Sequence, residues 1–516
     1  MSLYKSISSM YYQAYQNIIS SLGYSNMNPE MYFATTMLIL FLTYISISLI
    51  SLIGRTKKQK YNLPPGPSLL TIMRNVFELG KKPQYSLAKF SKIYGPIMHL
   101  KLGQITTIVI SSPDIAQEVF QTHDLSISDR TIPQAVAVLG HEHFSLPFMP
   151  MSNLWRDLRK ICKNNLFSNK TLDASNELRC KKLQELLCDI DRSSLVGEAV
   201  DVEKAAFKTL LNVLSNTFFS MDFVNSAGET DEYKDIVESL MTAIGTPNLV
   251  DFFPILRMFD PQGIRGISAT YAEKLLQIFD SYITKRLELR NEENYVTNGD
   301  MLDNLLNISQ ENGQMMDTTK IQHLFLDLFV AGTDTTSYAI ERGMAELVHN
   351  PHAMLKAKEE LKQIIGIGNP IEESDITRLP YLQAVVKETL RMHPSAPLLL
   401  PKKARVDVKI HGYTIPQGAQ VVINEWAIGR NPNIWDNPNS FLPERFLGSE
   451  INFNGQNFQL TPFGGGRRIC PGMPLATKMI HMMLGSLINF FDWKLENGDR
   501  DINQPLRAIP VRVNKV

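Results

Sequence analysis

Hydrophobic and polar positions divide the chain into an uncharged run near its start and a long region dominated by helical spacing. The run from Met31 to Ile53 has no charged residue and extends over 23 positions. As a helix, that length crosses a hydrocarbon layer of about 30 Å. The run is longer than the apolar part of a signal peptide, and no small-residue cleavage site follows it. The pattern therefore predicts a transmembrane anchor at residues 31–53, in preference to a buried core helix.

The flanks of this run give it an orientation. A polar extension, residues 1–30, precedes it, and the basic side chains Arg55, Lys57, Lys58 and Lys60 follow it. Basic residues stay on the cytoplasmic side, so the rest of the chain is expected to face the cytosol. The stretch "LPPGP" then stiffens the backbone. We therefore expect a basic, proline-rich linker at residues 54–67 and one domain at residues 68–516, with no later transmembrane segment.

Within that domain, helical patterns outnumber short β-like pieces. A long helical pattern runs from about Lys320 to His349 and ends before Pro351. The stretches 106–111 ("TTIVIS") and 419–424 ("AQVVIN") are rich in β-branched residues, and a polar loop at 291–299 separates two helical regions. The pattern predicts a mainly helical fold with small β-sheets.

Composition narrows the possible functions. The chain has 52 basic and 52 acidic side chains, which gives no support to nucleic-acid binding. Its 4 cysteines are too few for a disulfide scaffold in a chain of 516 residues. Cys162, Cys180 and Cys188 lie in one helical region and are interpreted as small buried side chains, whereas Cys470 stands alone between polar and turn-forming residues.

The surroundings of Cys470 suit a metal-binding thiolate. In "PFGGGRRICPG", residues 462–472, the glycines let the backbone approach a flat ligand, and Arg468 suits an anionic group. A helical pattern follows at once, and a helix N-terminus stabilises a thiolate. The alternative is a turn that carries an inert cysteine.

A second candidate lies inside the long helical pattern. Gly332 costs roughly 1 kcal/mol there relative to alanine, and the neighbouring threonines are also poor helix formers. Such local violations often mark functional sites. At helical spacing, one face carries Phe325, Leu328, Gly332, Thr335 and Ala339. Gly332 would leave room for a ligand, and Asp334 and Thr335 would relay protons; the alternative is a solvated helix face.

Three further patterns pair charged or aromatic side chains. Glu388 and Arg391 are three residues apart in "KETLR" and can pair on one helix face, with Arg445 of "FLPERF" as a third member. Trp155 and Arg159 lie one turn apart in "WRDLRK".

In order and spacing, these elements resemble the cytochrome P450 family of haem-thiolate monooxygenases. The resemblance covers nearly everything from "LPPGP" onward and implies the cytochrome P450 fold. It assigns Cys470 as the ligand of the iron in haem b, Asp334 and Thr335 to oxygen activation, and Glu388, Arg391 and Arg445 to a structural triad. The other haem-binding residues that it implies are Arg468, Trp155, Arg159, Arg130, Lys402, Phe463, Gly466 and Gly472.

Within the family, the chain resembles the plant microsomal terpenoid hydroxylases of the geraniol hydroxylase and ferruginol synthase type. The stretches that carry this resemblance are residues 154–169, 381–394 and 466–477. By resemblance, residues 131–148, 395–400 and the helix face line the substrate pocket. The individual residues assigned to that pocket are Phe325, Leu328, Phe329, Ala331, Gly332, Ala396 and Leu398. Because these segments are mostly apolar, an uncharged mono- or diterpenoid is expected, with Asp334 as the only charge on the helix face.

The resemblance also implies a setting: the endoplasmic reticulum membrane, with one membrane span, a cytosolic domain and electrons from NADPH–cytochrome P450 reductase. Arg156, Lys160 and Lys163 are a candidate docking face for that acidic partner, with an ordinary solvated helix face as the alternative. The apolar stretch 248–259, "NLVDFFPILRMF", is expected to dip into the membrane, with packing inside the domain as the alternative. "HEHF", residues 141–144, is interpreted as a loop, in preference to a metal site.

The chain departs from the family pattern in two places. Lys402 stands where arginine or histidine is usual. The stretch 497–504 is shorter than the pocket-lining region that relatives usually have. The shortened stretch leaves a catalytically impaired homologue as an alternative. Two others also stay open: an alkaloid- or betalain-pathway hydroxylase, whose relatives share much of the pattern, and a haem-thiolate isomerase or dehydratase.

Overall fold

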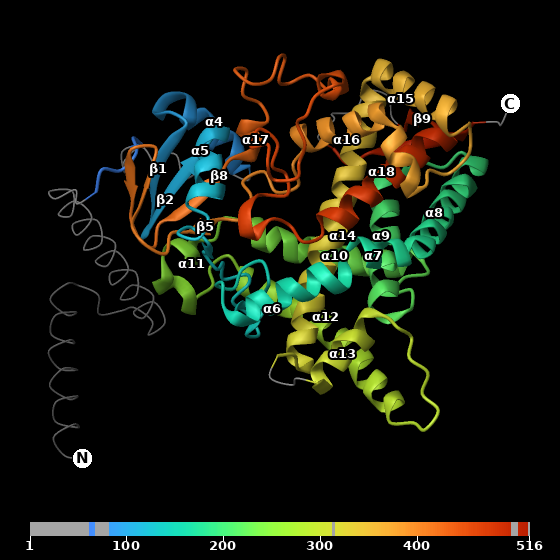
Figure 1. Ribbon diagram of the computed structural model, residues 1–516, viewed down its shortest axis with the longest axis horizontal. Helices are drawn as coiled ribbons and strands as arrows, with labels where there is room; N and C mark the ends of the chain where they lie inside the picture. Colours follow the sequence, from blue (N-terminus) through green and yellow to red (C-terminus); the bar gives the residue numbers. More distant parts are fainter. Residues whose placement is uncertain (1–60, 68–81, 312–314, 497–503, 514–516) are drawn as a thin grey trace, which may run out of the picture. The chain divides into compact units, whose positions relative to one another are not determined.

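The largest sheet joins strands from distant parts of the chain (Figure 1). The structure is a computed structural model that describes residues 61–67, 82–311, 315–496 and 504–513. In the sheet order β1-β2-β8-β5-β3, β2 and β8 run parallel, with Ile108 opposite Val421. The bounds are β1 (Ile97–Leu102), β2 (Ile105–Ile110), β8 (Gln420–Ile423), β5 (Lys402–Lys403) and β3 (Asp129–Arg130). The strands predicted at 106–111 and 419–424 are therefore confirmed, and they are neighbours.

Two smaller sheets complete the β-structure of the described residues. One has the order β4-β10-β9 and pairs the end of the chain with β4, about 300 residues earlier. Its bounds are β4 (Val200–Asp201), β9 (Phe491–Leu495) and β10 (Arg507–Arg512). The other is the hairpin of β6 (Val408–Ile410) and β7 (Tyr413–Ile415).

Helices make up most of the described domain, as predicted. The longer ones are α4 (Pro83–Tyr94), α6 (Asn153–Ile161), α8 (Asn176–Val196), α9 (Val202–Phe219), α10 (Ala227–Gly245), α12 (Ile264–Arg290), α13 (Met301–Glu311), α14 (Thr318–His349), α15 (Pro351–Ile364), α16 (Pro380–Met392) and α18 (Met473–Phe490). The short ones are α5 (Pro113–Gln117), α7 (Asn169–Ala174), α11 (Leu249–Phe252) and α17 (Glu425–Ile428). The described residues also form short π-helices, η1 (Glu118–Thr122) and η3 (Cys162–Leu166). The short 3-10 helices are η2 (His141–His143), η4 (Pro254–Met258), η5 (Glu373–Arg378), η6 (Pro443–Phe446) and η7 (Gly466–Arg468).

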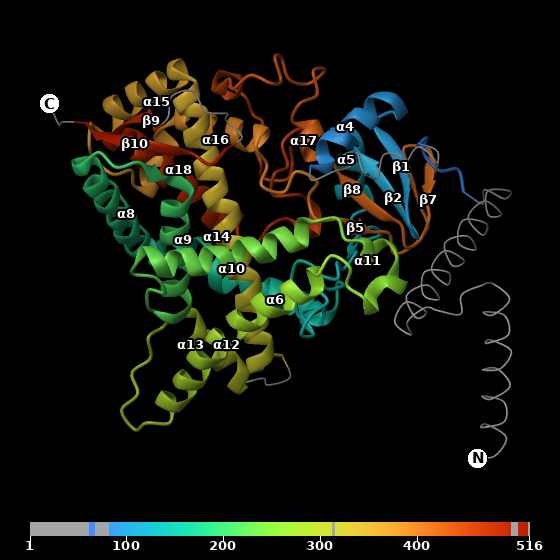
Figure 2. The same ribbon diagram turned by 180° about the vertical axis from the view of Figure 1, so that it is seen from behind.

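Helix α14 is the long helix that the sequence predicts, and it begins and ends for local reasons. The side chain of Asp317 accepts a hydrogen bond from the backbone N–H of Lys320 at 2.9 Å, which caps the first turn. Pro351 has no N–H to continue the ladder, and it starts α15 instead. Figure 2 shows α10 crossing in front of α9 and α14, so α14 lies inside the helical region.

Two hydrophobic clusters meet along α14. One contains side chains of α8, α9, α16 and α18, and the other contains side chains of α6, α9, α12 and α13. Gly332 lies where α14 passes α9, and a Cβ atom there would meet Leu214 Cδ1 at 2.9 Å. The sequence predicts that the space beside Gly332 is for a ligand alone. The structure shows that this room also admits the side chain of Leu214.

The described residues cover the predicted domain, but only a small part of the segments predicted before it. Residues 63–516 form one compact unit. Among the described residues, no helix combines the length and the apolar character that crossing a membrane requires. The anchor predicted at 31–53, the extension at 1–30, residues 54–60 of the linker and residues 497–503 of the shortened stretch lie outside the described residues.

Glu388 on α16 forms the centre of a buried ionic network. Its carboxylate accepts two hydrogen bonds from Arg391, both at 2.7 Å, and one from Arg445 Nε at 3.1 Å. It also accepts the backbone N–H of Leu442 at 2.8 Å. The side chains of Glu388 and Arg391 are fully buried, and Arg391 also donates to the carbonyl oxygens of Pro438 and Ser440. The network thus ties α16 to the segment that leads into the cysteine loop.

We predict that Glu388→Gln lowers the free energy of unfolding by about 3–5 kcal/mol, because it leaves Arg391 as a buried charge without a counter-ion. Chemical denaturation measures the change. Arg192→Gln is the control, because Arg192 forms an exposed pair with Asp189, and an exposed pair contributes under about 1 kcal/mol. Equal midpoints for the two variants would contradict the structural role of Glu388.

Candidate active site

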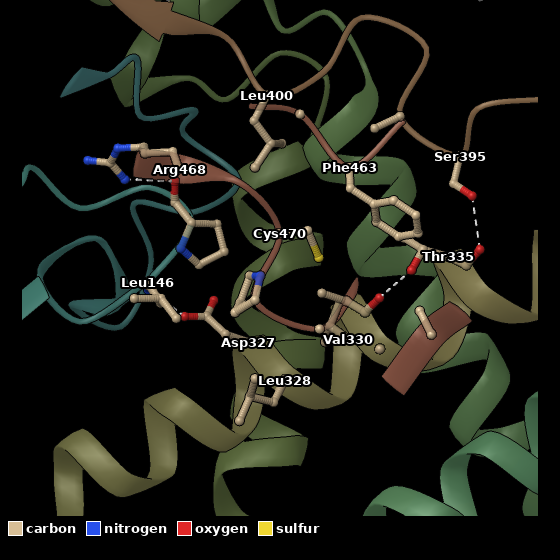
Figure 3. Close-up of a pocket in the computed structure, with 18 of the residues that line it drawn as sticks. Leu146, Asp327, Leu328, Val330, Thr335, Ser395, Leu400, Phe463, Arg468 and Cys470 are labelled. Atoms are coloured by element: carbon tan, nitrogen blue, oxygen red, sulfur yellow. Dashed lines mark hydrogen bonds between the residues drawn. The ribbon is translucent and has the colours of Figure 1, made fainter. Parts of the chain in front are cut away.

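A cavity of about 370 Å³ lies between α14, the cysteine loop and residues 130–148 (Figure 3). Most of its walls are hydrocarbon side chains, including Val138, Leu214, Leu328 and Leu475. The residues from the predicted site that line it are Arg130, Trp155, Arg159, Leu328, Ala331, Gly332, Thr335, Ala396, Lys402, Phe463, Arg468, Cys470 and Gly472. The tertiary structure therefore brings these separate motifs to one place.

Cys470 lies at the end of the glycine-rich loop, just before α18. Its backbone N–H donates to the carbonyl oxygen of Phe463 at 2.9 Å, which closes the loop. Gly464 and Gly466 have φ angles of 72° and 66°, which side chains other than glycine adopt only with strain. Burial raises the pKa of the Cys470 thiol, while the backbone N–H groups of Gly472 and Met473 act in the opposite direction. The loop thus holds a sulfur atom at the cavity wall beside donors that favour a thiolate.

Three cationic side chains gather at another part of the cavity. Burial and the nearby Arg130 lower the pKa of Lys402 to about 7, and burial lowers the pKa of Arg468 to about 10. Burial and Arg468 likewise lower the pKa of Arg130 to about 9. Lys402 Nζ is buried and has no hydrogen-bond partner among the described residues. Neighbouring buried cations repel one another, so an anionic ligand between them would relieve the repulsion.

The other predicted anion-binding residues support this arrangement. Arg468 donates to the carbonyl oxygens of Ser128 at 2.6 Å and Met149 at 2.7 Å, and its guanidinium carbon lies 5.0 Å from the centre of the Trp155 ring. Trp155 Nε1 donates to Leu146 O at 3.1 Å. Arg159 donates to the carbonyl oxygen of Ile469, next to the cysteine.

A cysteine on one wall and a group of cations on another fit haem, which combines a central iron with two anionic propionates. The thiolate is an established iron ligand, and the cations suit the propionates. Lys402 is a point charge where arginine would form a fork, yet its Nζ has no hydrogen bond to the described residues and is available to a propionate. The residues present therefore fit the group.

Of the two polar residues expected on the cavity-facing side of α14, one lies there and the other does not. Thr335 lines the cavity, and its hydroxyl donates to Ala331 O at 2.6 Å. Asp334 does not line the cavity; its electrostatic neighbours are Glu203 of α9 and Glu238 and Lys234 of α10. Burial, followed by Glu203 and Glu238, raises the pKa of Asp334 to about 7. Asp334 is therefore placed behind the wall, where it titrates near neutral pH.

Besides Asp334, four residues predicted to bind the cofactor or the substrate lie outside the cavity wall. Phe325 and Phe329 are buried in an aromatic cluster with Phe218, Phe219 and Phe279, because they project toward α9 and α12. Helical spacing grouped Phe325 with the cavity face, although its ring is needed in the core.

The other two lie beside sheet and loop elements. Leu398 packs against the hydrophobic cluster of α4 and the first two strands. Gly466 is outside the cavity wall, and a Cβ atom there would come within 2.4 Å of Asp124 Oδ1. The glycine therefore permits the loop to approach Asp124, whose carboxylate accepts the backbone N–H of Arg467.

The structure also adds polar residues that the sequence analysis did not assign. Asp327 of α14 lines the cavity, so Asp334 is not the charge that faces it. Asp327 is hydrogen-bonded to His141, which belongs to the stretch interpreted as an ordinary loop. Ser395 donates to the backbone carbonyl of Thr335 at 2.9 Å. The position of Asp327, two turns before Thr335 on one helix face, was the available signal.

The fold and this site define a haem-thiolate protein, and comparison with known proteins agrees. The family model described as cytochrome P450 matches residues 64–512. A geraniol 8-hydroxylase from Catharanthus roseus is 48% identical over 92% of this chain and 98% of its own length. A ferruginol synthase from Isodon rubescens is 44% identical over 89% of this chain and 96% of its own length. A geranylhydroquinone 3''-hydroxylase from Arnebia euchroma is 44% identical over 93% of this chain and 99% of its own length.

The chain belongs to the cytochrome P450 family. It is a haem-dependent monooxygenase, and the resemblance inferred from its motifs is confirmed.

We predict that Lys402→Met speeds the loss of haem about tenfold to hundredfold, because a charge-assisted hydrogen bond to a propionate is removed. Transfer of haem to apomyoglobin measures the rate. Lys403→Met is the matched control, since Lys403 is the exposed neighbour on the same strand and should leave the rate unchanged. Equal rates of loss for the two variants would exclude the assigned role.

Proposed function

We propose that this protein is a membrane-anchored monooxygenase that hydroxylates an uncharged terpenoid, with Cys470 as the ligand of the haem iron. The observation that carries the proposal is the largely hydrocarbon wall of the cavity beside Cys470. Such a wall holds an apolar skeleton by shape. Two relatives are named for hydroxylating geraniol and geranylhydroquinone, which agrees with that chemistry.

When bound, haem supplies oxygen activation and insertion of one oxygen atom into a C–H bond. The chain supplies the surroundings. Leu328, Leu214 and Val138 exclude water and orient the skeleton, while Arg130, Lys402 and Arg468 hold the propionates. Cys470 would supply its sulfur to the iron, and the N–H groups of Gly472 and Met473 oppose the effect of burial, which raises the pKa of the thiol.

Proton supply is assigned to Asp334 and Thr335. Asp334 is near its own pKa at neutral pH, so its carboxyl group both holds and releases a proton there. Lys234 pairs with Glu203 at 3.6 Å and also with Glu238, whose side chain is 46% exposed. Glu203 and Glu238 both raise the pKa of Asp334, so these carboxylates are electrostatically coupled to it. The Thr335 hydroxyl, held by Ala331 O, presents its oxygen at the cavity wall.

The setting that we propose is the endoplasmic reticulum membrane, with NADPH–cytochrome P450 reductase as electron donor. The uncharged run at 31–53 and the basic residues after it support this. Arg156 and Lys160 lie on exposed positions of α6 and remain candidates for the reductase contact. An alkaloid- or betalain-pathway substrate is the alternative for the same cavity.

We predict that membranes containing this protein and a plant reductase convert geraniol or geranylhydroquinone to a hydroxylated product that requires NADPH. Product detection by mass spectrometry is the measurement, and Cys470→Ala should form none. A product that forms without NADPH would instead indicate an isomerase or dehydratase. Conversion of tyrosine, with no terpenoid converted, would overturn the proposed substrate class.

We also predict a pH dependence that belongs to Asp334. Its pKa is raised to about 7, so it carries a proton below that pH and loses it above. The fraction of NADPH electrons recovered in product should fall as the pH rises from 6 to 8. In Asp334→Asn this fraction should be low at every pH, because no titrating carboxyl remains.

The control for this test is Asp173→Asn, since the side chain of Asp173 is 72% exposed and lies on α7, away from the cavity wall. It should keep the wild-type pH profile. An unchanged profile in Asp334→Asn would remove Asp334 from proton supply.

An exposed apolar patch is a candidate for membrane contact by the domain. The stretch 248–259 forms α11 and η4, and Met258 and Phe259 are 92% and 65% exposed. Leu249, Phe253 and Ile255 are exposed beside them. The patch is fixed to the domain, because Gln104 N donates to Phe252 O at 3.1 Å and Gln134 N donates to Asp251 at 2.8 Å. We propose that this patch enters the lipid interface.

In a variant that lacks residues 1–60, changing Met258 and Phe259 together to serine should reduce sedimentation with membranes. Each apolar side chain removed contributes roughly 1.5–3 kcal/mol when fully buried. The matched control changes Leu195 and Val196 to serine, since they are 77% and 68% exposed on α8. Equal sedimentation of the two variants would show that the patch is not a lipid contact.

A further inference from the structure

A carboxylate faces the largely apolar cavity from α14. Asp327 lines the cavity, and its side chain is only 8% exposed. It precedes Thr335 by eight residues, which is about 12 Å along the helix axis. Figure 3 shows its side chain next to Leu146.

Three hydrogen bonds fix the Asp327 carboxylate. Oδ1 accepts from Ser145 Oγ at 2.9 Å and from His141 Nε2 at 3.1 Å, while Oδ2 accepts the backbone N–H of Leu146 at 2.7 Å. A carboxylate offers about four acceptor positions, so Oδ2 retains one. The remaining position is available to a donor inside the cavity.

His141 is itself held in place, which makes the group rigid. Its Nδ1 lies 3.0 Å from Nδ1 of His323, and the His323 ring stacks on Phe144 with a centroid distance of 4.9 Å. Burial lowers the pKa of His323 to about 4, so His323 is neutral at physiological pH. His141 thus bridges the two groups, with Nε2 toward Asp327 and Nδ1 toward His323. The four side chains Ser145, Asp327, His141 and His323 form one ordered chain of hydrogen bonds.

We propose that Asp327 Oδ2 accepts a hydrogen bond from a hydroxyl group of the substrate and thereby orients an otherwise apolar skeleton. The inference rests on the proposed function and narrows its substrate class to alcohols and phenols. Hydrocarbon walls grip by shape and allow several orientations, whereas one fixed acceptor selects among them. A substrate that lacks the hydroxyl leaves this acceptor desolvated and unpaired, which costs affinity.

A hydroxyl group fits this site better than an ammonium group. Asp327 already accepts three hydrogen bonds, which offset much of its charge.

The test titrates the haem-loaded enzyme with geraniol and with geranyl methyl ether, which has the same skeleton but no O–H donor. The wild type should bind the alcohol about tenfold to hundredfold more tightly, as expected for a hydrogen bond to a charged acceptor. Asp327→Asn is nearly isosteric, and it should lower this preference about tenfold while binding of the ether changes little. The haem difference spectrum and calorimetry both measure the affinities.

Ser145→Ala is the matched control, because it removes a bond to Oδ1 and leaves Oδ2 in place; the preference for the alcohol should persist. As a second measure, the hydroxylated products of geraniol should become a mixture of positions in Asp327→Asn.

Three results would overturn the inference: equal wild-type affinity for alcohol and ether, an equal loss for both ligands in Asp327→Asn, or tighter binding of geranylamine than of geraniol. Each of these leaves the proposed terpenoid function intact. If neither the alcohol nor the ether binds to the wild type, the proposed function itself fails.

Discussion

Helix α14 has to bury side chains on nearly every side along its 32 residues, and the cavity depends on how it does so. Its aromatic residues Phe325 and Phe329 pack into the cluster shared with α9 and α12. Its later residues pack against α16 and α18. The narrow strip left over, with Asp327, Leu328, Ala331 and Thr335, is the cavity wall. Packing on the other faces therefore fixes where each of these groups points.

The second constraint is electrostatic. Arg130, Lys402 and Arg468 come from β3, β5 and η7, and their pKa values are lowered mainly by burial. A fold gains nothing from gathering three cations in its interior unless an anion joins them. Haem propionates would supply that anion, and cofactor binding would then stabilise this region. The buried Glu388–Arg391 pair is different, because the chain itself supplies both signs of charge.

Apolar walls and polar groups have separate tasks around the cavity. The hydrocarbon side chains exclude water and strengthen every electrostatic contact inside. Burial, followed by the neighbours Glu203 and Glu238, raises the pKa of Asp334, which lies behind the wall, to about 7. Asp327, in the wall, has three donors as partners. Two carboxylates on one helix thus have different environments.

Much of the site was predictable because its chemistry is local in the sequence. The glycine-rich loop around Cys470, the helix ending before Pro351 and the Glu388–Arg391 spacing each need only neighbouring residues, so their patterns remain visible. The strands 106–111 and 419–424 were also predicted, since β-branched residues mark them. Their parallel pairing was not, because nothing local encodes a contact between residues about 300 positions apart.

The sequence by itself determined the family, the cofactor and the identity of the long helix. Only the tertiary structure decided which face of that helix meets the cavity. Helical spacing placed Phe325 on the ligand side, but its ring packs in the core against aromatic rings of α9 and α12. The tertiary structure also decided that Asp327, and not Asp334, faces the cavity. A 3.6-residue period defines neighbours on a helix surface, but the residues that pack against each face come from distant parts of the chain.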